Sequence, residues 1–188
     1  MSSTDARSRL REAQGFLSPK TVRERAVVEF DELFRSGAVP EPPPEGFLSG
    51  SLITSTTWDS LDLVSRRLAE LYMPWLGKSF DPASNEGVNV LKRSAVTPMR
   101  ALWPSYKVLR EYDDRVEAFR FRTRIDTGAV DPSINVLKID YDFDANPDLL
   151  IRKILDELVQ IDDGLYLGKV LYRGKGGYRP IGYFSLER

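Results

Sequence analysis

The sequence of 188 residues contains neither cysteine nor histidine. Without Cys the chain forms no disulfide and offers no thiolate nucleophile or thiolate metal ligand. Without His, the chain alone cannot supply Ser-His-Asp catalysis, His-Glu metal motifs or a proximal histidine for haem. The sequence therefore predicts no metal and no cofactor, and any acid-base chemistry falls to Asp, Glu, Lys or Tyr side chains.

The chain also lacks an excess of charge and a long hydrophobic run. Lys and Arg number 27 against 28 for Asp and Glu, so no large basic field attracts a phosphate backbone, and we expect no nucleic acid partner. No segment approaches the ~18 apolar residues of a membrane-spanning helix, and residues 1–11 are polar and charged. We therefore expect a cytoplasmic protein without a membrane span.

Residues 18–37 carry the pattern of an amphipathic helix. Ser18 and Pro19 suit an N-cap and a first helical position, and apolar residues follow at helical spacing until Gly37. Such a stripe mostly packs on its own domain, with a partner or a second copy of the chain as the alternative. Residues 1–17 show little periodicity and predict a frayed or weakly helical tail. The proline-rich residues 38–46 predict a stiff, extended connector.

The rest of the chain alternates in the manner of β-strands. Strands are predicted at residues 47–55, 88–94, 106–112, 115–125, 136–143, 166–173 and 178–186, with turn residues between them. One helix is predicted between Thr56 and Pro74. A second is predicted over residues 146–158, because Asn146-Pro147-Asp148 resembles a helix start and an apolar stripe follows.

Many strands joined by short turns indicate a sandwich or a barrel, and terminal hairpins favour an up-and-down barrel. We therefore predict a mainly β fold, an antiparallel β-barrel with an N-terminal helix and one or two flanking helices. The predicted organisation is a tail and helix over residues 1–37, the connector over 38–46 and the barrel domain over 47–188.

Charged residues alternate on two neighbouring predicted strands. One strand carries Arg120, Arg122 and Arg124, and the next carries Lys138, Asp140, Asp142 and Asp144. A hairpin closed by residues 127–134 sets the arginines opposite the aspartates and leaves aromatic residues on the other face. A solvated salt-bridge ladder is the favoured interpretation. A polar cavity lining and a cation site are weaker alternatives, the latter because arginine already neutralises the carboxylates.

The segment from Arg173 to Gly177 combines glycines with Lys175, as phosphate-binding loops do. It precedes a strand rather than a helix, however, so a hairpin turn is the favoured interpretation.

Aromatic residues on the strands supply a candidate ligand site. Tyrosine gives an apolar wall with a hydroxyl tip, which suits a mostly apolar ligand with one polar group, although aromatic strand residues more often form simple core. The candidate ligand-binding residues are Trp75, Phe119, Phe121, Tyr141, Tyr166, Tyr172 and Tyr183. No residue is singled out as catalytic.

Several short motifs resemble a known family. They are Phe30-Asp31-Glu32-Leu33, Gly46-Phe47-Leu48-Ser49-Gly50, Trp75-Leu76-Gly77-Lys78-Ser79-Phe80, Gly164-Leu165-Tyr166-Leu167-Gly168 and Tyr183-Phe184-Ser185-Leu186-Glu187-Arg188. In this order they resemble the lipocalin-like proteins of the calycin group that carry GXWXGK-type motifs, over about residues 30–188. The motif at residues 46–50 has Leu48 where the family typically shows Trp. The resemblance implies a lipocalin-like barrel that can enclose a hydrophobic ligand.

Within these motifs the residue types also suggest structural roles. We expect Trp75 and Phe80 to anchor the core, Gly77 to occupy a tight backbone position and Lys78 to cap or cover the barrel end.

Three functions remain open at this point. The favoured one is binding of a small, largely hydrophobic molecule, such as a lipid, pigment or polyketide-like metabolite, inside the barrel. The second is a cyclase or isomerase that uses the same cavity with Tyr or carboxylate acid-base chemistry. The third is a protein-interaction module, with a homo-oligomer as one form of it.

Overall fold

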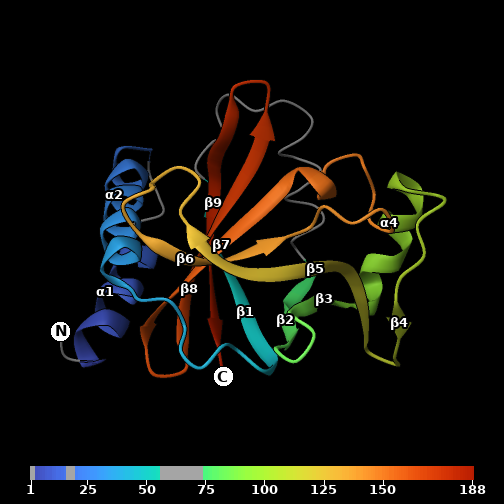
Figure 1. Cartoon of the computed structure of the whole chain (residues 1–188), viewed down its shortest axis with the longest axis horizontal. Helices are drawn as coiled ribbons and strands as arrows, with labels where there is room; N and C mark the ends of the chain where they lie inside the picture. The colour runs from blue at the N-terminus through green and yellow to red at the C-terminus, as the bar shows by residue number, and fades with distance from the viewer. Residues whose placement is uncertain (1–2, 16–19, 56–73) are drawn as a thin grey trace.

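Eight antiparallel strands close into a barrel in the computed structural model, which describes residues 3–15, 20–55 and 74–188 (Figure 1). Closure follows because β9 pairs with β1 and β3 pairs with β5. The strands of the barrel are β1 (Gly46–Ser55), β2 (Trp75–Asp81), β3 (Glu86–Lys92), β5 (Arg115–Thr127), β6 (Asn135–Asp140), β7 (Ile154–Asp162), β8 (Leu165–Gly174) and β9 (Gly177–Glu187). The predicted antiparallel barrel is confirmed.

Two helices cover one side of the barrel, α1 (Ser3–Gly15) and α2 (Lys20–Ser36) (Figure 1). The apolar face of α2, with Phe30, Leu33 and Phe34, is buried in one cluster with Val159 and Leu167 from the outer face of the sheet. The predicted amphipathic helix is therefore confirmed, and its stripe packs on its own barrel. On the opposite side lie α4 (Val96–Leu102), preceded by the 3-10 turn η1 (Arg93–Ala95), and the two-residue strand β4 (Arg110–Glu111). No described helix is long and apolar enough to cross a membrane.

The helix predicted over residues 146–158 is wrong. The structure has the short 3-10 turn η2 (Ile151–Lys153) followed by β7. The first six residues of β7 are all buried, because its inner face lines the barrel and its outer face lies under the N-terminal helices. A strand buried on both faces has a continuous apolar run, which imitates a helical stripe over a short window.

Other elements differ from the predictions at their edges. The tail, expected to be frayed or weakly helical, forms the helix α1, whose small residues Ala6 and Ala13 are buried against α2 and the barrel. Only Arg110 and Glu111 pair as a strand within predicted strand 106–112. The segment after β3, for which no helix was expected, contains α4. The helix predicted between Thr56 and Pro74 lies outside the described residues.

Candidate functional site

The interior of the barrel holds a cluster of polar side chains in an otherwise apolar core. Lys78 comes from β2, Asn89 from β3, Asp156 from β7, and Tyr141 from the residue after β6. All four are buried, and Lys78 and Asp156 are fully so. Cross-strand register brings them together, since Lys78 pairs with Asn89 and Asp156 pairs with Ile139, two residues before Tyr141. We call these four residues the polar centre.

Hydrogen bonds connect every member of the polar centre. The Lys78 Nζ forms an ion pair with Asp156 Oδ2 at 2.9 Å. It also donates to Asn89 Oδ1 at 3.1 Å and to the Tyr141 hydroxyl. The Tyr141 hydroxyl in turn donates to Asp156 Oδ2 at 2.9 Å. Three N–H groups of an ammonium therefore meet three acceptors, the number that a buried lysine needs.

Asn89 is held in one orientation by its neighbours. Its Oδ1 accepts from Trp75 Nε1 at 3.1 Å as well as from Lys78. Its Nδ2 donates to the Phe119 carbonyl and to the Tyr141 hydroxyl, each at 3.2 Å. Because both donors and both acceptor positions are used, the amide links β2, β3, β5 and Tyr141 into one network.

Aromatic rings enclose the ammonium of Lys78. Its Nζ lies between 5.1 and 5.5 Å from the centres of four rings, which belong to Trp75, Phe121, Tyr141 and Phe184. Cations at this distance are attracted to ring faces, more strongly where water is absent. We call this arrangement the aromatic box.

Glycines make room for the box. A Cβ atom at Gly168 would lie 2.1 Å from the ring of Phe184, and one at Gly87 would lie 2.3 Å from that of Phe121. Gly50, expected to allow a close backbone approach, likewise lies under Trp75, whose ring would be 2.4 Å from a Cβ there. A side chain at any of these glycines would displace a ring from Lys78.

The charges of the polar centre balance each other. Burial lowers the pKa of Lys78, and the adjacent Asp156 carboxylate opposes that shift without reversing it. The pair of Lys78 and Asp156 has no net charge in its ionised form. Asp156 Oδ1, by contrast, accepts no hydrogen bond and is the only buried side-chain oxygen or nitrogen in this condition within the described part of the chain. An acceptor of this kind is costly unless a donor reaches it.

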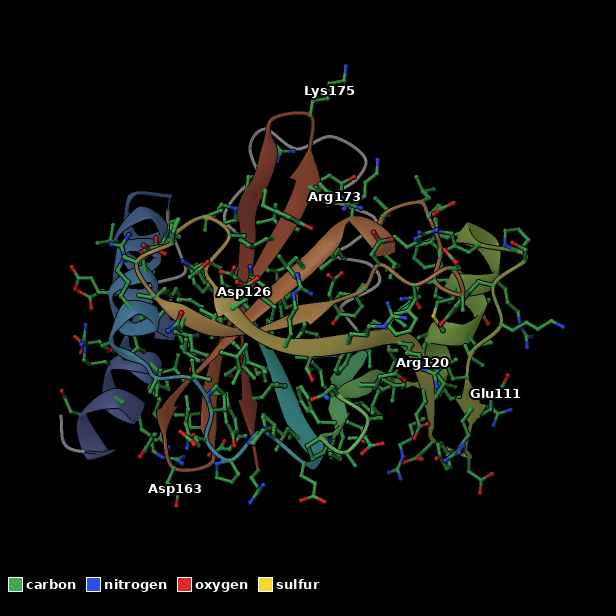
Figure 2. The ribbon with its side chains drawn as sticks, in the orientation of Figure 1. Glu111, Arg120, Asp126, Asp163, Arg173 and Lys175 are labelled. Atoms are coloured by element: carbon green, nitrogen blue, oxygen red, sulfur yellow. The ribbon has the colours of Figure 1, made fainter. Side chains whose placement is uncertain are left out.

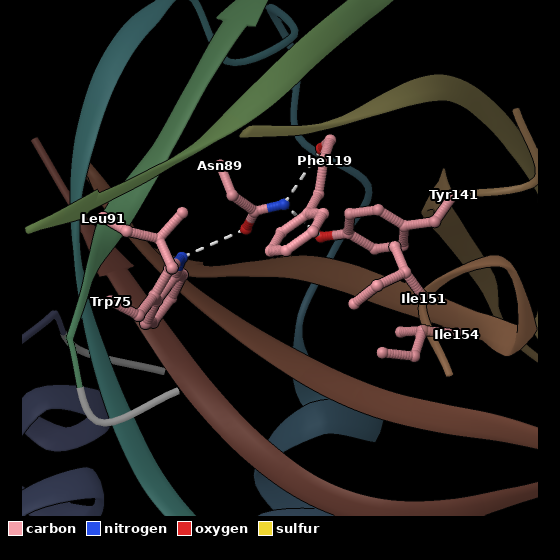
Figure 3. Close-up of a pocket in the computed structure, with 7 residues that line it drawn as sticks. All are labelled: Trp75, Asn89, Leu91, Phe119, Tyr141, Ile151 and Ile154. Atoms are coloured by element: carbon pink, nitrogen blue, oxygen red, sulfur yellow. Dashed lines mark hydrogen bonds between the residues drawn. The ribbon is translucent and has the colours of Figure 1, made fainter. Parts of the chain in front are cut away.

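A small cavity lies beside the polar centre (Figure 3). Its volume is about 20 Å³, which exceeds the ~10–15 Å³ that one water molecule requires. Figure 3 shows Asn89 between Trp75 and Tyr141 at this cavity, bonded to both. The lining residues are Trp75, Asn89, Leu91, Phe119, Tyr141, Ile151 and Ile154. The cavity therefore joins the polar centre to an apolar wall.

Part of that wall comes from residues 141–153, which connect β6 to β7 and which we call the cover segment. Leu150 has φ 77° and ψ −60°, and the N–H of Ile151 donates to the carbonyl of Leu149 at 3.1 Å. This is a γ-turn of the rare, strained hand, and backbone strain of this kind is worth of order 1–3 kcal/mol. The strained turn places Ile151 against the cavity.

The opposite wall also contains an unusual backbone. Phe119 has φ 52° and lies where the pairing of β3 with β5 shifts register. Its ring stacks on Tyr106 with centres 5.2 Å apart, and Tyr106 accepts a hydrogen bond from the Phe119 N–H at 2.7 Å. Burial raises the pKa of Tyr106 to about 12. The bulge turns the aromatic side chain into the barrel.

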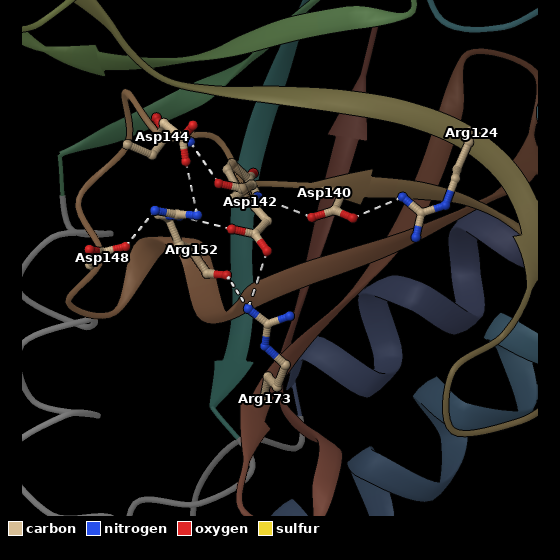
Figure 4. Close-up of polar contacts among 9 residues, drawn as sticks. Arg124, Asp140, Asp142, Asp144, Asp148, Arg152 and Arg173 are labelled. Carbon is tan, nitrogen blue, oxygen red and sulfur yellow. Dashed lines mark hydrogen bonds and ion pairs between the residues drawn. The ribbon is translucent and has the colours of Figure 1, made fainter.

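Ionic contacts on the outside stabilise the cover segment, and Arg173 of β8 ties it to the barrel through Asp142 at 3.4 Å (Figure 4). Within the segment, Arg152 lies among three carboxylates, with Asp142 at 2.8 Å, Asp148 at 2.7 Å and Asp144 at 3.2 Å. Trp103 adds a hydrogen bond from its Nε1 to the Leu149 carbonyl at 3.1 Å. Residues predicted as one side of a charged ladder thus hold the segment that closes the cavity.

The predicted ladder itself forms only in part, on the outside of the barrel. The hairpin and its register are confirmed, with Arg122 opposite Asp140, and Arg124 binds Asp140 at 2.9 Å. Arg120, however, pairs with Glu86 at 3.3 Å. The ladder stops because β6 ends at Asp140, so the later aspartates turn toward Arg152. Within the described residues, no group of three His, Cys, Asp or Glu side chains is placed to hold a metal ion.

The glycine-rich segment at 173–177 is a hairpin turn, as favoured. Gly174 pairs with Gly177, which has φ 101°. Figure 2 shows Lys175 at the tip of this hairpin, pointing away from the barrel. The turn therefore belongs to the β8–β9 hairpin, where positive φ favours glycine.

The structure places the candidate ligand residues in three locations. Trp75, Phe119 and Tyr141 line the cavity. Phe121 and Tyr166 belong to the core inside the barrel, and Tyr172 packs at its margin. Tyr183 lies on the other side of the sheet under α2, where its hydroxyl donates to Asp31 at 2.6 Å. Tyr183 is therefore separated from the interior set by the sheet itself.

Sequence reasoning missed Lys78, Asn89 and Asp156. Lys78 was expected to cap or cover the barrel end, and it lies fully buried inside instead. Alternation from Trp75 puts position 78 outside, but a bulge between Trp75 and Gly77 reverses it. The signal that could have found it is Phe80, a core anchor two residues later on the same face. The expectations for Trp75, Phe80 and Gly77 are confirmed, and Gly77 has φ 148°.

Fold and site together define a closed eight-stranded antiparallel barrel that carries N-terminal helices outside and an ion pair inside. No protein-family model and no curated protein sequence matches the chain. Among solved structures the chain is similar to the crystal structure of a protein from Thermomonospora curvata, with a TM-score of 0.55 and 18% sequence identity over 98% of each chain. At this identity the likeness shows a shared fold.

Proposed function

We propose that the barrel binds a small, largely apolar molecule through one neutral oxygen group at the polar centre. The observation that carries this proposal is the hydrogen-bonding cluster of Lys78, Asn89, Tyr141 and Asp156, enclosed by aromatic rings and adjoining a cavity. Ligand sites combine an apolar lining with a few placed polar groups in this way. The motifs that resemble lipocalin-like proteins support the same function.

Electrostatics favours a hydroxyl or carbonyl over a carboxylate as the ligand's polar group. The ionised pair of Lys78 and Asp156 is already neutral, so an anionic ligand would bring an uncompensated charge into the barrel. Burying such a charge is far costlier than burying a hydrogen-bonded neutral group. A hydroxyl can also donate a hydrogen bond, and Asp156 Oδ1 is a buried acceptor without a donor. Alcohols and carbonyl compounds are therefore the proposed ligand class.

The cover segment provides the route by which the site gains volume. The present cavity of about 20 Å³ is large enough for one water molecule, whereas small-molecule sites typically occupy about 300–1,000 Å³. Residues 141–153 form no ladder with a neighbouring strand, so an outward shift of Ile151 breaks no strand pairing. The ligand's polar group is expected to occupy the present cavity and its apolar part to displace Ile151.

Methyl NMR tests the proposal directly, with hexan-1-ol and hexanoate as probes. Ile151 and Ile154 line the cavity, whereas Ile125 is exposed on the outer face and serves as the reference. Hexan-1-ol is expected to shift the methyl signals of Ile151 and Ile154 in a saturable manner, and hexanoate is not. Unchanged signals up to the solubility limit of hexan-1-ol contradict the proposal.

A matched pair of variants locates the site. Ile151→Phe fills the cavity from the cover segment and is expected to abolish the saturable shifts at Ile154. Leu149→Phe adds the same ring two residues away, where the side chain is 60% exposed, and is expected to leave binding intact. Equal loss in both variants shows that the shifts arise elsewhere.

An isomerase or cyclase is a second candidate because one hydroxyl joins the cavity to a carboxylate. Tyr141 lines the cavity and also donates to Asp156, so a proton can pass between a bound molecule and Asp156 through Tyr141. Deuterium exchange at the carbon next to the carbonyl of bound hexan-2-one tests this candidate. Exchange that is catalysed by the protein and lost in Tyr141→Phe supports it, and exchange at the rate in buffer alone refutes it.

A further inference from the structure

Lys78 has the surroundings that covalent carbonyl chemistry needs. Its Nζ lies in an aromatic box, 2.9 Å from a carboxylate, and is hydrogen-bonded to Asn89 and Tyr141, which line the cavity. A lysine of this kind can act as a nucleophile toward an aldehyde or ketone. Resting on the function proposed above, we infer that Lys78 condenses with an apolar aldehyde or ketone to form an imine, with Asp156 as its counter-ion.

The atoms of the reaction balance without any further reactant. The ammonium of Lys78 first gives a proton to Asp156, and the free amine attacks the carbonyl carbon to form a C–N bond. The carbonyl oxygen takes up this proton and a second one from the nitrogen, so that the C–O bond breaks and water leaves. The product is a protonated C=N–H group beside an ionised Asp156. The adjacent cavity has room for the one water released.

The hydrogen-bond network tolerates this change. An iminium keeps a single N–H, which can remain on Asp156 Oδ2. The two acceptors that lose Lys78 each retain another donor, since Asn89 Oδ1 still accepts from Trp75 and Tyr141 still accepts from Asn89 Nδ2. Imine formation therefore strands no hydrogen-bonding group of the network, which is the usual penalty for altering a buried polar cluster.

The environment also suits both states of the nitrogen. Burial lowers the pKa of Lys78, which increases the fraction of free amine available for attack. After condensation the ring faces of Trp75, Phe121, Tyr141 and Phe184 face a delocalised cation. The same rings give an apolar surface for the hydrocarbon part of the ligand.

Two other buried lysines provide internal controls. Lys138 binds Asp126 at 2.9 Å and Lys169 binds Asp31 at 2.6 Å, both on the outer face of the sheet. Each is buried and ion-paired like Lys78, but the ion-pair partners Asp126 and Asp31 do not line the cavity. Lys107 and Lys175 are exposed and report on ordinary amine reactivity.

The experiment treats the folded protein at neutral pH with limiting hexanal and sodium cyanoborohydride, which reduces an iminium to a stable amine. Peptide mapping then measures the hexylated fraction of each lysine. The hexylated fraction of Lys78 is expected to exceed those of Lys107 and Lys175 several-fold, since a lowered pKa leaves more free amine at neutral pH. Lys138 and Lys169 are expected to remain unmodified. Modification that simply follows exposure, with Lys78 unmodified, overturns the inference.

The failure of the inference and of the proposed function are distinguishable. If hexan-1-ol shifts the Ile151 and Ile154 methyl signals while hexanal leaves Lys78 unmodified, the barrel binds neutral ligands without covalent chemistry, and only the imine is refuted. If neither probe occupies the site, both proposals fail. Lys78→Arg serves as the matched variant, because it retains a cation for Asp156 but cannot form this imine. Hexylation at position 78 must vanish in it while the exposed lysines react as before.

Discussion

Lys78→Met isolates the energetic role of the buried ion pair. The change keeps much of the length and the apolar stem of the side chain but removes the ammonium, leaving the buried Asp156 carboxylate without its cation. Asp156 Oδ2 then keeps only the Tyr141 hydroxyl as a donor, and Oδ1 has none. Removing one partner of a buried pair costs about 3–5 kcal/mol. For a domain of this size each 1 kcal/mol lowers Tm by roughly 2–4 °C.

Replacing both partners separates the energetic contribution of the ion pair from that of the groups around it. In Lys78→Met/Asp156→Leu no charge remains inside the barrel, so we expect the double variant to be at least about 1 kcal/mol more stable than Lys78→Met. It will not recover all of the loss, because the Tyr141 hydroxyl has lost its carboxylate acceptor, which is worth about 1–3 kcal/mol.

Urea unfolding followed by tryptophan fluorescence measures these differences, since Trp75 and Trp103 are both buried. If the losses of the single variants Lys78→Met and Asp156→Leu simply add in the double variant, Lys78 and Asp156 do not interact energetically. A loss below about 1 kcal/mol in Lys78→Met shows that Asp156 is neutral or reached by water. Either result refutes the ion pair as described.

Three further predictions concern other parts of the molecule. Burial raises the pKa of Glu157, although the Ala129 N–H, Lys138 and Lys169 each lower it. Above about pH 4.3 the folded state therefore binds more protons than the unfolded state. The free energy of unfolding falls as the pH rises from there to the raised pKa. Glu157→Gln removes this contribution, so its urea midpoint should fall less between pH 4.5 and 7 than that of the unaltered protein, and an identical fall refutes the assignment. Gly77→Ala places a Cβ 2.0 Å from the Leu48 carbonyl oxygen at a φ of 148°. Chemical unfolding should show a loss of about 3 kcal/mol or more in the free energy of unfolding. Gly176→Ala is the control, because a Cβ there has no atom within 4 Å, and it should change the free energy of unfolding by no more than about 0.5 kcal/mol. Arg152→Ala releases three aspartates of the cover segment and should speed amide exchange at residues 149–153 by roughly fivefold. Arg35→Ala, which breaks the exposed ion pair with Asp131, should leave that exchange unchanged.

The barrel was predictable because its strands alternate and its turns are marked. The hairpin of β5 and β6 illustrates this, since the alternation of Arg122 and Arg124 with apolar neighbours fixes the register seen in the structure. The strand β7 was not predictable in the same way. Its buried run includes Asp156 and Glu157, which face opposite sides of the sheet, and burial on the outer face depends on helices more than 100 residues earlier in the sequence.

The candidate site was predictable only in its aromatic half. Trp75, Phe119 and Tyr141 were selected because aromatic strand residues line barrels, and they do line the cavity. In the charged half, the inward position of Lys78 depends on the β-bulge between Trp75 and Gly77. A bulge reverses which face a side chain takes, so strict alternation from Trp75 places Lys78 on the wrong face, and Phe80 two residues later is the local signal for its true side.

The polar centre is not what holds the barrel closed, and this makes its presence informative. Cross-strand hydrogen bonds close the sheet, and an extensive apolar core fills the interior around Lys78. A buried ion pair is weak evidence for stability, because well-packed apolar residues in its place are often neutral or stabilising. Stability alone therefore accounts poorly for Lys78 and Asp156. Binding accounts for them better, because a ligand with one neutral oxygen needs hydrogen-bonding groups already oriented in a dry interior. Lys78→Met/Asp156→Leu separates the two explanations: a folded barrel that no longer binds hexan-1-ol assigns the pair to ligand recognition, whereas unchanged binding assigns it to the core.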